Sequence, residues 1–363
     1  MTRRTRKEAH DGKGISLYPG LGMTREELVG RVEQAAKKGM TRLFLSFHIP
    51  ETNEAAFQKD IDALFEAARC YDLNVVGDLV PGRPIPEALT HLRLDDGFTP
   101  ERIKELQTRY PQKTLVLNAS TVTEGFLLSL EKAGVDVGCV EALHNFYPRP
   151  HTGLSEAFFL RQNVLCHHYG IKVGAFVRSF GACRGPLFKG LPTLEIHRTL
   201  DFFLALQHLR LLGTDAFYIG DDGATEDELD ALAQLDDVLT LTLLTEKITA
   251  LHEKLAACIF TLRPDEAEEV LRAQNSRALF KEMDIPPFTL KYLPQGTVTL
   301  DNRLAGRYAG EVEITLTDLP ADPSVNVMGR VSEEERFLLG LMRGGARFRF
   351  RLVTKAAPIK SKK

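Results

Sequence analysis

Carboxylate residues at the ends of short apolar runs are the first candidates for chemistry in this 363-residue chain. Asp78 and Asp95 each lie within or directly after such a run rather than in a polar turn. A carboxylate next to buried residues loses hydration energy unless it is partnered, so its presence there points to a function. Carboxyl groups carry general acid–base chemistry. We therefore treat Asp78 and Asp95 as the leading catalytic candidates, with Glu141 and Glu195 as contenders.

The densest group of polar residues lies in the segment LHNFYPRPHTGLS at 143–155. It contains His144, Asn145, Tyr147 and Arg149, and its two prolines restrict the backbone. Side chains of these types can hold a polar ligand. The alternative is a rigid packing loop in which His144 is a buried histidine with satisfied hydrogen bonds.

A second unusual segment, RSFGACRGPLFKGLPTLEIHR at 178–198, is rich in glycine and longer than an ordinary strand-to-helix loop. Backbone amides in such a loop, together with Arg184 or Arg149, suit a phosphate group, and Gly185 lets the backbone approach it closely. The alternative is a surface loop whose basic side chains are solvated.

Other polar side chains follow further apolar runs and are expected at the same site. They are Ser16, Tyr18, His48, Glu51, Asn118 and Glu141. Asp96 and Asp221 best fit structural roles, because aspartate at the end of a strand commonly caps the next helix.

Two other chemistries have weaker support in the sequence. A Schiff-base enzyme needs a lysine at the catalytic end of a strand, and Lys172 stands at the opposite end of its run. A metal site built from His48, Asp78 and His144 is conceivable, but no compact ligand motif supports it. We therefore predict no metal and no cofactor.

Alternating strand-like and helix-like segments between residues 14 and 245 must position these side chains. Eight such cycles predict a (β/α)8 barrel of the TIM type, in which functional groups follow the carboxyl ends of the strands. A Rossmann-type open sheet is the second choice, since no Gly-x-Gly-x-x-Gly follows the first strand. The predicted strands are 14–19, 42–47, 74–79, 91–95, 114–119, 137–143, 172–177 and 216–221.

Helical patterns fill most of the intervals between these strands. The first has a capping box, Thr24 with Glu27, and ends at Gly39. The interval between the third and fourth strands is short and poorly patterned, which is the weakest point of the count. The other predicted helices are 53–71, 100–109, 122–133, 154–169, 195–212 and 225–236.

A different pattern follows, and it predicts a β-rich domain over residues 246–354. Residues 297–318 alternate like paired strands around a turn, 332–345 predict a helix capped by Ser332 and Glu335, and 347–354 predict a final strand. Residues 1–13 and 355–363 are expected to be flexible ends.

Composition restricts the class of protein. Lysine plus arginine number 46 against 49 acidic residues, so a general nucleic-acid binder is disfavoured. The five cysteines form no CxxC pair and indicate reduced thiols. The sequence contains no apolar run of about 18 residues and no signal peptide, which predicts a cytoplasmic protein that does not bind membranes.

Motifs along nearly the whole chain resemble the 6-phospho-N-acetylmuramidases, glycoside hydrolase family 170, formerly called outer surface proteins. They include GISLYPG, SFHIPE, LRLDDGF, LNAST, HNFYPRPHTGLS and RGPLFKGLPTLEIHR. The resemblance implies a (β/α)8 barrel followed by a cyclophilin-like β domain. It also implies cleavage of 6-phospho-N-acetylmuramyl-N-acetylglucosamine, a phosphorylated amino-sugar disaccharide, during cell-wall recycling in the cytoplasm.

Glycoside hydrolysis requires two carboxyl groups, so under this resemblance Asp78 and Asp95 form or include the pair, with Glu195 and Glu141 as alternatives. Asn118, His144, Asn145 and Tyr147 would position the sugar, and Arg149 and Arg184 would bind the phosphate. Two alternatives remain open: a non-catalytic phosphosugar-binding or regulatory protein, and a hydrolase of another phosphoglycoside. A homodimer is a separate expectation, compatible with each of them.

Overall fold

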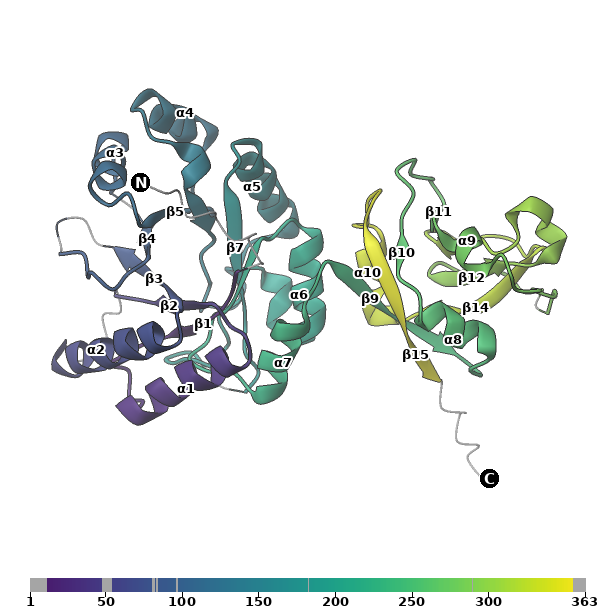
Figure 1. The fold of residues 1–363 in the computed structure, drawn as a ribbon, viewed down its shortest axis with the longest axis horizontal. Helices are drawn as coiled ribbons and strands as arrows, with labels where there is room; N and C mark the ends of the chain where they lie inside the picture. Colours follow the sequence, from purple (N-terminus) through teal and green to yellow (C-terminus); the bar gives the residue numbers. More distant parts are fainter. Residues whose placement is uncertain are drawn as a thin grey trace. The chain divides into compact units, whose positions relative to one another are not determined.

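The computed structural model describes residues 12–47, 54–79, 82, 84–95, 97–181, 183–288 and 290–354. The chain divides into two compact units, residues 1–235 and 236–363 (Figure 1). The first unit alternates strands and helices, and the second is built mainly of strands.

Eight parallel strands of the first unit close into a barrel in sequence order, so the predicted TIM-type barrel is confirmed. Each strand pairs with the next, and β8 pairs with β1. The strands are β1 (Gly12–Leu17), β2 (Arg42–Leu45), β3 (Asn74–Leu79), β4 (His91–Leu94), β5 (Thr114–Asn118), β6 (Glu141–Leu143), β7 (Lys172–Val177) and β8 (Ala216–Ile219).

The sixth strand is shorter than predicted. Residues Val137–Cys139 form a 3-10 turn, and the amides of Cys139 and Val140 bond to carbonyls within that turn. Because these amides are satisfied locally, the residues before Glu141 do not join the sheet. Glu141 is consequently the first residue of β6, not a residue near its end.

Helices cover the outside of the barrel, and the capping box of Thr24 and Glu27 is present as predicted. The segment predicted as one helix over 195–212 is a 3-10 turn, η2 (Glu195–Arg198), followed by α6, which Asp201 caps. Between β3 and β4 the described residues contain no helix. The helices are α1 (Arg25–Lys37), α2 (Glu54–Cys70), α3 (Pro100–Arg109), α4 (Glu124–Lys132), α5 (Glu156–His168), α6 (Phe202–Leu211) and α7 (Glu226–Gln234).

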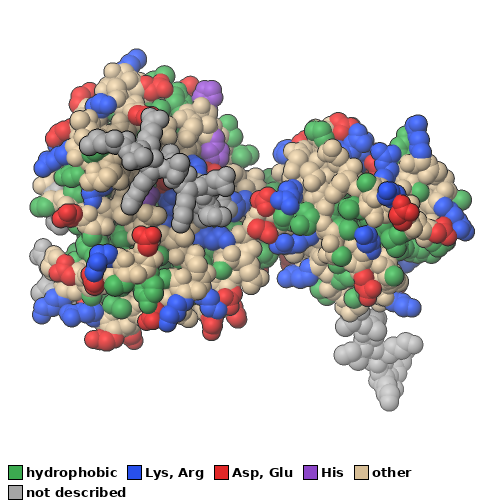
Figure 2. Space-filling model, viewed as in Figure 1, with side chains coloured by type: hydrophobic (Ala, Val, Ile, Leu, Met, Phe, Trp, Pro, Cys, Tyr) green, Lys and Arg blue, Asp and Glu red, His purple; other side chains and the backbone are tan. Residues whose placement is uncertain are grey.

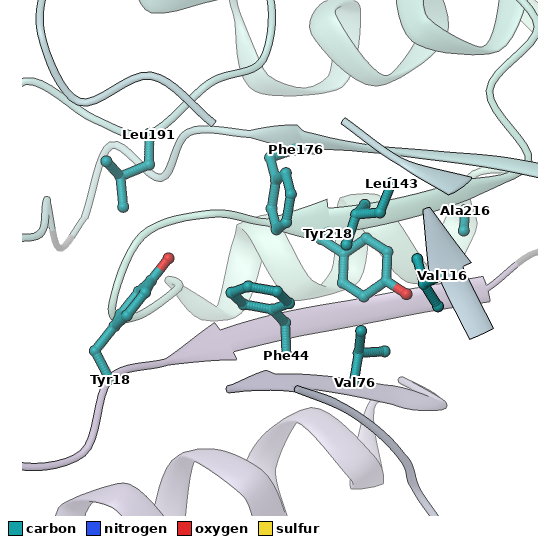
Figure 3. Packing of buried hydrophobic residues seen from close by; sticks show 9 residues of the cluster. All are labelled: Tyr18, Phe44, Val76, Val116, Leu143, Phe176, Leu191, Ala216 and Tyr218. Carbon is teal, nitrogen blue, oxygen red and sulfur yellow. The ribbon is translucent and has the colours of Figure 1, made fainter. Parts of the chain in front are cut away.

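Buried aromatic and aliphatic side chains fill the middle of the barrel (Figure 3). Phe176 contacts Phe44 and Tyr218 with ring centroids 5.3 and 5.4 Å apart. Figure 3 shows Tyr18 at the end of this cluster toward which the β1 arrow points. Since parallel strands share a direction, Tyr18 marks the carboxyl end of the barrel, here called the mouth, and the opposite end is called the base.

The second unit contains a seven-stranded sheet in the order β10-β15-β9-β14-β12-β13-β11. The predicted strand pair around residues 297–318 is confirmed as antiparallel β12 and β13. A β-rich second unit is therefore present, and its cyclophilin-like character stays a prediction. The strands are β9 (Val238–Thr245), β10 (Phe260–Thr261), β11 (Val270–Arg272), β12 (Thr297–Asp301), β13 (Val312–Thr315), β14 (Val325–Val331) and β15 (Arg347–Thr354).

Two details of the second unit differ from the sequence prediction. The segment 238–245, which we assigned to the barrel, is β9 and pairs with β14 and β15, so the units divide after Leu235. The predicted capping box at Ser332 does not form, because Glu335 instead accepts hydrogen bonds from Thr242. The helices of this unit are short: α8 (Ala250–Ala256), α9 (Ser276–Phe280) and α10 (Arg336–Leu339).

The described side chains on the face drawn in Figure 2 mix acidic and basic groups, in line with a formal net charge of −3. Within the described residues, every helix is too short or too polar to cross a membrane.

Candidate active site

Polar side chains line the mouth of the barrel at the ends of β3, β4, β5 and β6. Asp78 stands at the end of β3 and is buried. Its carboxylate accepts a hydrogen bond from the Ser46 hydroxyl at 2.8 Å and one from the Phe47 amide at 2.5 Å. Two donors from the end of β2 fix the orientation of this carboxylate.

Asp95, directly after β4, forms the centre of a second polar group. Its side chain is 43% exposed and accepts a hydrogen bond from the Asn118 amide at 2.8 Å. Arg93 lies behind it, almost fully buried, with one guanidinium nitrogen 3.6 Å from the Asp95 carboxylate. Arg93 also donates to the side-chain oxygen of Asn145. The structure thus brings Asp95, Asn118 and Asn145 together, with Arg93 as an additional member of this group.

Aromatic rings form the floor of the mouth. Phe146 packs edge-on against Tyr18, Phe44 and Phe176, with ring centroids 5.2 to 6.2 Å apart. The guanidinium of Arg184 lies over the Tyr18 ring, 4.3 Å from its centroid, and 5.5 Å from that of Phe146. A cation held by ring faces keeps its N–H groups available to an anion.

Two adjacent carboxylates follow β8. Asp221 is fully buried and accepts hydrogen bonds from the backbone amides of Ser179, Arg184 and Leu191. It therefore shapes the loop after β7, which agrees with its predicted structural role. Asp222 accepts a hydrogen bond from the Tyr18 amide at 3.2 Å. Burial raises the pKa of Asp222 to about 6.

Glu195 fastens the two long loops of the mouth to each other. Its carboxylate accepts hydrogen bonds from the amides of His151 and Gly153 at 2.9 and 2.8 Å and pairs with Arg198 at 2.7 Å. Arg198 in turn donates to the carbonyl of Tyr147. The hydrogen bond with Arg198 is the main reason that the pKa of Glu195 falls to about 2. The low pKa excludes Glu195 as a proton donor, and because both of its carboxylate oxygens are engaged by His151, Gly153 and Arg198, we assign it a positioning role.

His144 does not line the mouth. It follows Leu143, which faces the barrel interior, and its own side chain points to the other face of β6 and is fully buried. One ring nitrogen lies 3.1 Å from the Ser120 hydroxyl and the other 3.0 Å from the side-chain oxygen of Asn163. Burial lowers the pKa of His144 to about 4. The prediction of a sugar contact is wrong, and the alternative of a satisfied buried histidine describes this residue.

Glu141 lies at the base of the barrel, so its predicted place among the residues of the mouth is wrong. Its carboxylate forms two hydrogen bonds with Arg42, at 2.5 and 3.0 Å. Burial pushes the pKa of Glu141 upward, but the hydrogen bonds and charge of Arg42 outweigh it and the pKa is lowered. Arg42 also donates to the Tyr218 hydroxyl. We read this group as a structural ion pair.

The other predicted residues occupy varied positions. Ser16 is fully buried within β1, below the mouth. Tyr147 is half-buried, Arg149 is exposed, and Gly185 follows Arg184 in the loop after β7. His48, Glu51 and Asp96 lie outside the described residues.

A metal centre built from His48, Asp78 and His144 receives no geometric support. Asp78 lies two residues after Val76, whose side chain faces the barrel interior, so the Asp78 side chain faces the interior as well. The His144 side chain points to the other face of the barrel wall. Within the described residues no group of three His, Cys, Asp or Glu side chains could hold a metal ion.

Sequence reasoning assigned no role to Arg93, Phe146 or Asp222. Arg93 and Phe146 belong to motifs that the sequence singles out, LRLDDGF and HNFYPRP. Asp222 could have been found from the Asp-Asp pair after the eighth strand, but sequence cannot tell which of the two is buried by the loop.

Cavities adjoin both carboxylates of the mouth. One of about 580 Å³ reaches Asp78 and is lined mainly by Phe, Pro and Ile side chains of the β2–α2 and β3–β4 segments. Another of about 330 Å³ touches Asp95 and Asn118. The mouth thus combines carboxyl groups in different environments, a cation held on aromatic rings and adjoining space, which suits acid–base chemistry on an anionic polar ligand.

Known families and structures match the chain over most of its length. Residues 13–234 match the family model "6-phospho-N-acetylmuramidase, N-terminal", and residues 239–351 match "6-phospho-N-acetylmuramidase, C-terminal". No curated protein matches the sequence.

Two solved structures are similar throughout. An uncharacterized protein of B. cereus shares 26% identity with a TM-score of 0.83, over 94% of this chain and all of that one. A conserved protein of unknown function from Enterococcus faecalis shares 30% identity with a TM-score of 0.65, over 95% of this chain and 96% of that one.

Proposed function

Because the chain belongs to the 6-phospho-N-acetylmuramidase family, and is therefore a glycosidase, we propose that it hydrolyses 6-phospho-N-acetylmuramyl-N-acetylglucosamine. The products would be 6-phospho-N-acetylmuramic acid and N-acetylglucosamine, released during cell-wall recycling in the cytoplasm. The observation that carries this proposal is that Asp78, Asp95 and Arg184 all lie at the mouth of the barrel. A phosphoglycosidase needs two carboxyl groups and an anion site.

In this proposal Asp78 acts as nucleophile or base. The hydrogen bonds from Ser46 and Phe47 hold its carboxylate in one orientation, as either role requires. Asp95 is the second carboxyl group of the same wall, and Asn118 and Asn145 orient the sugar hydroxyls together with Tyr147. If Asp78→Asn and Asp95→Asn both keep near-normal turnover, this assignment is wrong.

The phosphate would bind at Arg184, with Arg149 approaching from the loop after β6. The rings of Tyr18 and Phe146 hold the Arg184 guanidinium at the centre of the floor. Arg184→Met is expected to reduce turnover of the phosphorylated disaccharide by about 10²-fold, as expected when one charge-assisted contact is lost. Turnover of the unphosphorylated disaccharide should hardly change, and an equal loss for both would reject this role.

Mass spectrometry of the protein incubated with the phosphorylated and unphosphorylated disaccharides, with and without chelator, tests the function itself. Release of N-acetylglucosamine from the phosphorylated substrate alone supports the proposal, and insensitivity to chelator supports a metal-free reaction. An intact substrate that nevertheless binds would favour a non-catalytic phosphosugar-binding protein. An unbound substrate would favour another phosphoglycoside.

The second unit is proposed to have the cyclophilin-like fold that the family resemblance implies. A homodimer is a further proposal, which sedimentation analysis of the purified protein tests directly. A single species with the mass of one 40.5 kDa chain would reject it.

A further inference from the structure

We propose that Asp222 is the proton donor of this reaction, delivering its proton to the glycosidic oxygen as the bond breaks. The inference rests on the proposed hydrolysis and assigns the acid of the carboxyl pair to Asp222, on the opposite wall of the mouth, in place of Asp95, with Asp78 as the nucleophile or base. Glycosidases divide the work between one protonated and one ionised carboxyl group, so the two must stand in different environments.

The position of Asp222 leaves one carboxyl oxygen available. The residue follows β8, and its Oδ1 accepts the Tyr18 amide at 3.2 Å, where β1 ends. Within the described residues Oδ2 has no hydrogen-bond partner. One oxygen is thus anchored to the barrel wall, which fixes the side chain, and the other is free to carry a proton.

Asp222 also lies beside the proposed phosphate site. Tyr18, whose amide it accepts, provides the ring on which the Arg184 guanidinium rests. The charged groups that act on Asp222 are Arg31 of α1, Arg184 of the loop after β7, and the neighbouring Asp221. A phosphate on C6 of the sugar bound to Arg184 would bring the glycosidic bond of that same sugar close to this wall.

The carboxyl groups of Asp222 and Asp78 stand in different environments. Burial, opposed in part by the Tyr18 amide and the two arginines, leaves the pKa of Asp222 at about 6. With this pKa, roughly one Asp222 carboxyl group in ten is protonated at pH 7. Asp78 instead accepts two hydrogen bonds, from the Ser46 hydroxyl and the Phe47 amide.

Asp221 shows why only one residue of the pair is a candidate. It is fully buried, and three backbone amides occupy its carboxylate. Burial raises the pKa of Asp221 too. A group without access to solvent cannot reach a substrate, so Asp221 holds the loop, whereas Asp222 is partly exposed.

The proton balance of the step is simple. The proton on Asp222 moves to the glycosidic oxygen, which keeps the electron pair of the broken C1–O bond and leaves as the hydroxyl of N-acetylglucosamine. A water molecule supplies the hydroxyl that C1 gains, and its remaining proton returns the carboxyl groups to their starting states. The sum is one disaccharide and one water giving two sugars.

A comparison of leaving groups tests this role. Asp222→Asn keeps the size of the side chain and the oxygen that accepts the Tyr18 amide, but it cannot donate an acidic proton. On the disaccharide, kcat/KM should fall by about 10²- to 10⁴-fold. On an aryl 6-phospho-N-acetylmuramide, whose phenolate leaves without protonation, the loss should stay below about 10-fold.

Each outcome has a distinct meaning. Equal losses on both substrates, or no loss on either, overturn the role of Asp222 while the proposed function stands. A wild-type protein that cleaves neither substrate overturns the function and with it the inference. Asp227→Asn, which changes an exposed carboxylate of α7, should leave both rates unchanged, and thermal unfolding of both variants checks that the fold is kept.

The pH profile supplies an independent reading. A required acid is lost as pH rises through its pKa, so wild-type kcat/KM for the disaccharide should fall above about pH 6. The substrate phosphate also titrates near pH 6. Only the difference between wild type and Asp222→Asn therefore reports on Asp222, and identical profile shapes for the two proteins would contradict the assignment.

Discussion

The two ends of the barrel use the same residue types in opposite ways. At the base, Arg42 and Glu141 form two short hydrogen bonds, and their side chains are only 14% and 20% exposed. At the mouth, Arg93 stays 3.6 Å from Asp95, whose side chain is 43% exposed. A carboxylate fully engaged by an arginine contributes to stability, whereas one held loosely and reached by solvent is available to a ligand.

Empty space alone does not separate the two ends. The base encloses a cavity of about 250 Å³ beside Arg42, Glu141 and Tyr218. The ion pair reaches across the base because β1 offers glycines there: a Cβ on Gly12 would lie 2.4 Å from the Arg42 Nε. The base therefore combines a cavity with satisfied charges, and it is the state of the carboxylates that identifies the mouth as the site.

The strongest test of this contrast is Asp78→Asn. We expect kcat to fall by about 10³-fold, since the variant removes a charged catalytic group, while the free energy of unfolding falls by only about 1 kcal/mol because the hydrogen bonds from Ser46 and Phe47 weaken. Steady-state kinetics on the phosphorylated disaccharide, together with thermal unfolding, measure both effects.

The matched control for that variant is Asp227→Asn, an exposed carboxylate of α7 in the same unit. It should change neither turnover nor melting temperature. A large loss of stability in Asp78→Asn would show that the mouth, like the base, uses its carboxylate for the fold, and the contrast would fail.

Glu141→Gln should have the reverse effect. It leaves the Arg42 guanidinium without its counterion, and we expect a loss of about 2–3 kcal/mol in the free energy of unfolding, below the range for fully buried pairs because both side chains retain some exposure. Urea unfolding measures this, and kcat of the folded variant should be unchanged.

Replacing both partners sharpens the result. Arg42→Met combined with Glu141→Met removes the uncompensated charge, so the double variant should be more stable than Glu141→Gln alone. If Glu141→Gln abolishes turnover while stability is kept, the base takes part in catalysis and our reading of the ion pair is wrong.

The barrel itself could be predicted from the sequence because alternating apolar runs carry strong local signals. The capping box of Thr24 and Glu27 was visible in the same way, since it depends on residues three positions apart. The prediction was wrong where a residue far away in the sequence supplies the hydrogen-bond partner. Glu335 accepts hydrogen bonds from Thr242 of β9 instead of capping its own helix, and the local sequence does not reveal this donor.

The site was harder to predict because small shifts in strand register decide it. The 3-10 turn Val137–Cys139 moves the start of β6 to Glu141 and so places that carboxylate at the base. One step of alternation turns His144 away from the interior that Leu143 faces. Neither change leaves a local signal, whereas Asp78 and Asn118 stand at strand ends that the sequence located closely.

Glu195 gives the smallest and most specific test, because it is a residue of the mouth that we assign to structure. Replacement by Gln removes the charge that pairs with Arg198 and weakens the hydrogen bonds to His151 and Gly153. At pH 7 we expect a loss of about 1 kcal/mol in unfolding free energy and less than a 10-fold fall in turnover.

The pH dependence of Glu195→Gln follows from the lowered pKa of Glu195, about 2 in the folded chain against roughly 4.3 in an unfolded one. A depressed carboxyl pKa contributes stability that is present above the unfolded value and is lost as pH falls toward the folded one. The difference in melting temperature between wild type and variant should therefore be constant from pH 8 to 5 and shrink below about pH 4. A constant difference down to pH 3 would show that shape rather than charge holds the two loops together. If turnover of Glu195→Gln falls as far as that of Asp78→Asn, Glu195 takes part in catalysis and does not only position the two loops.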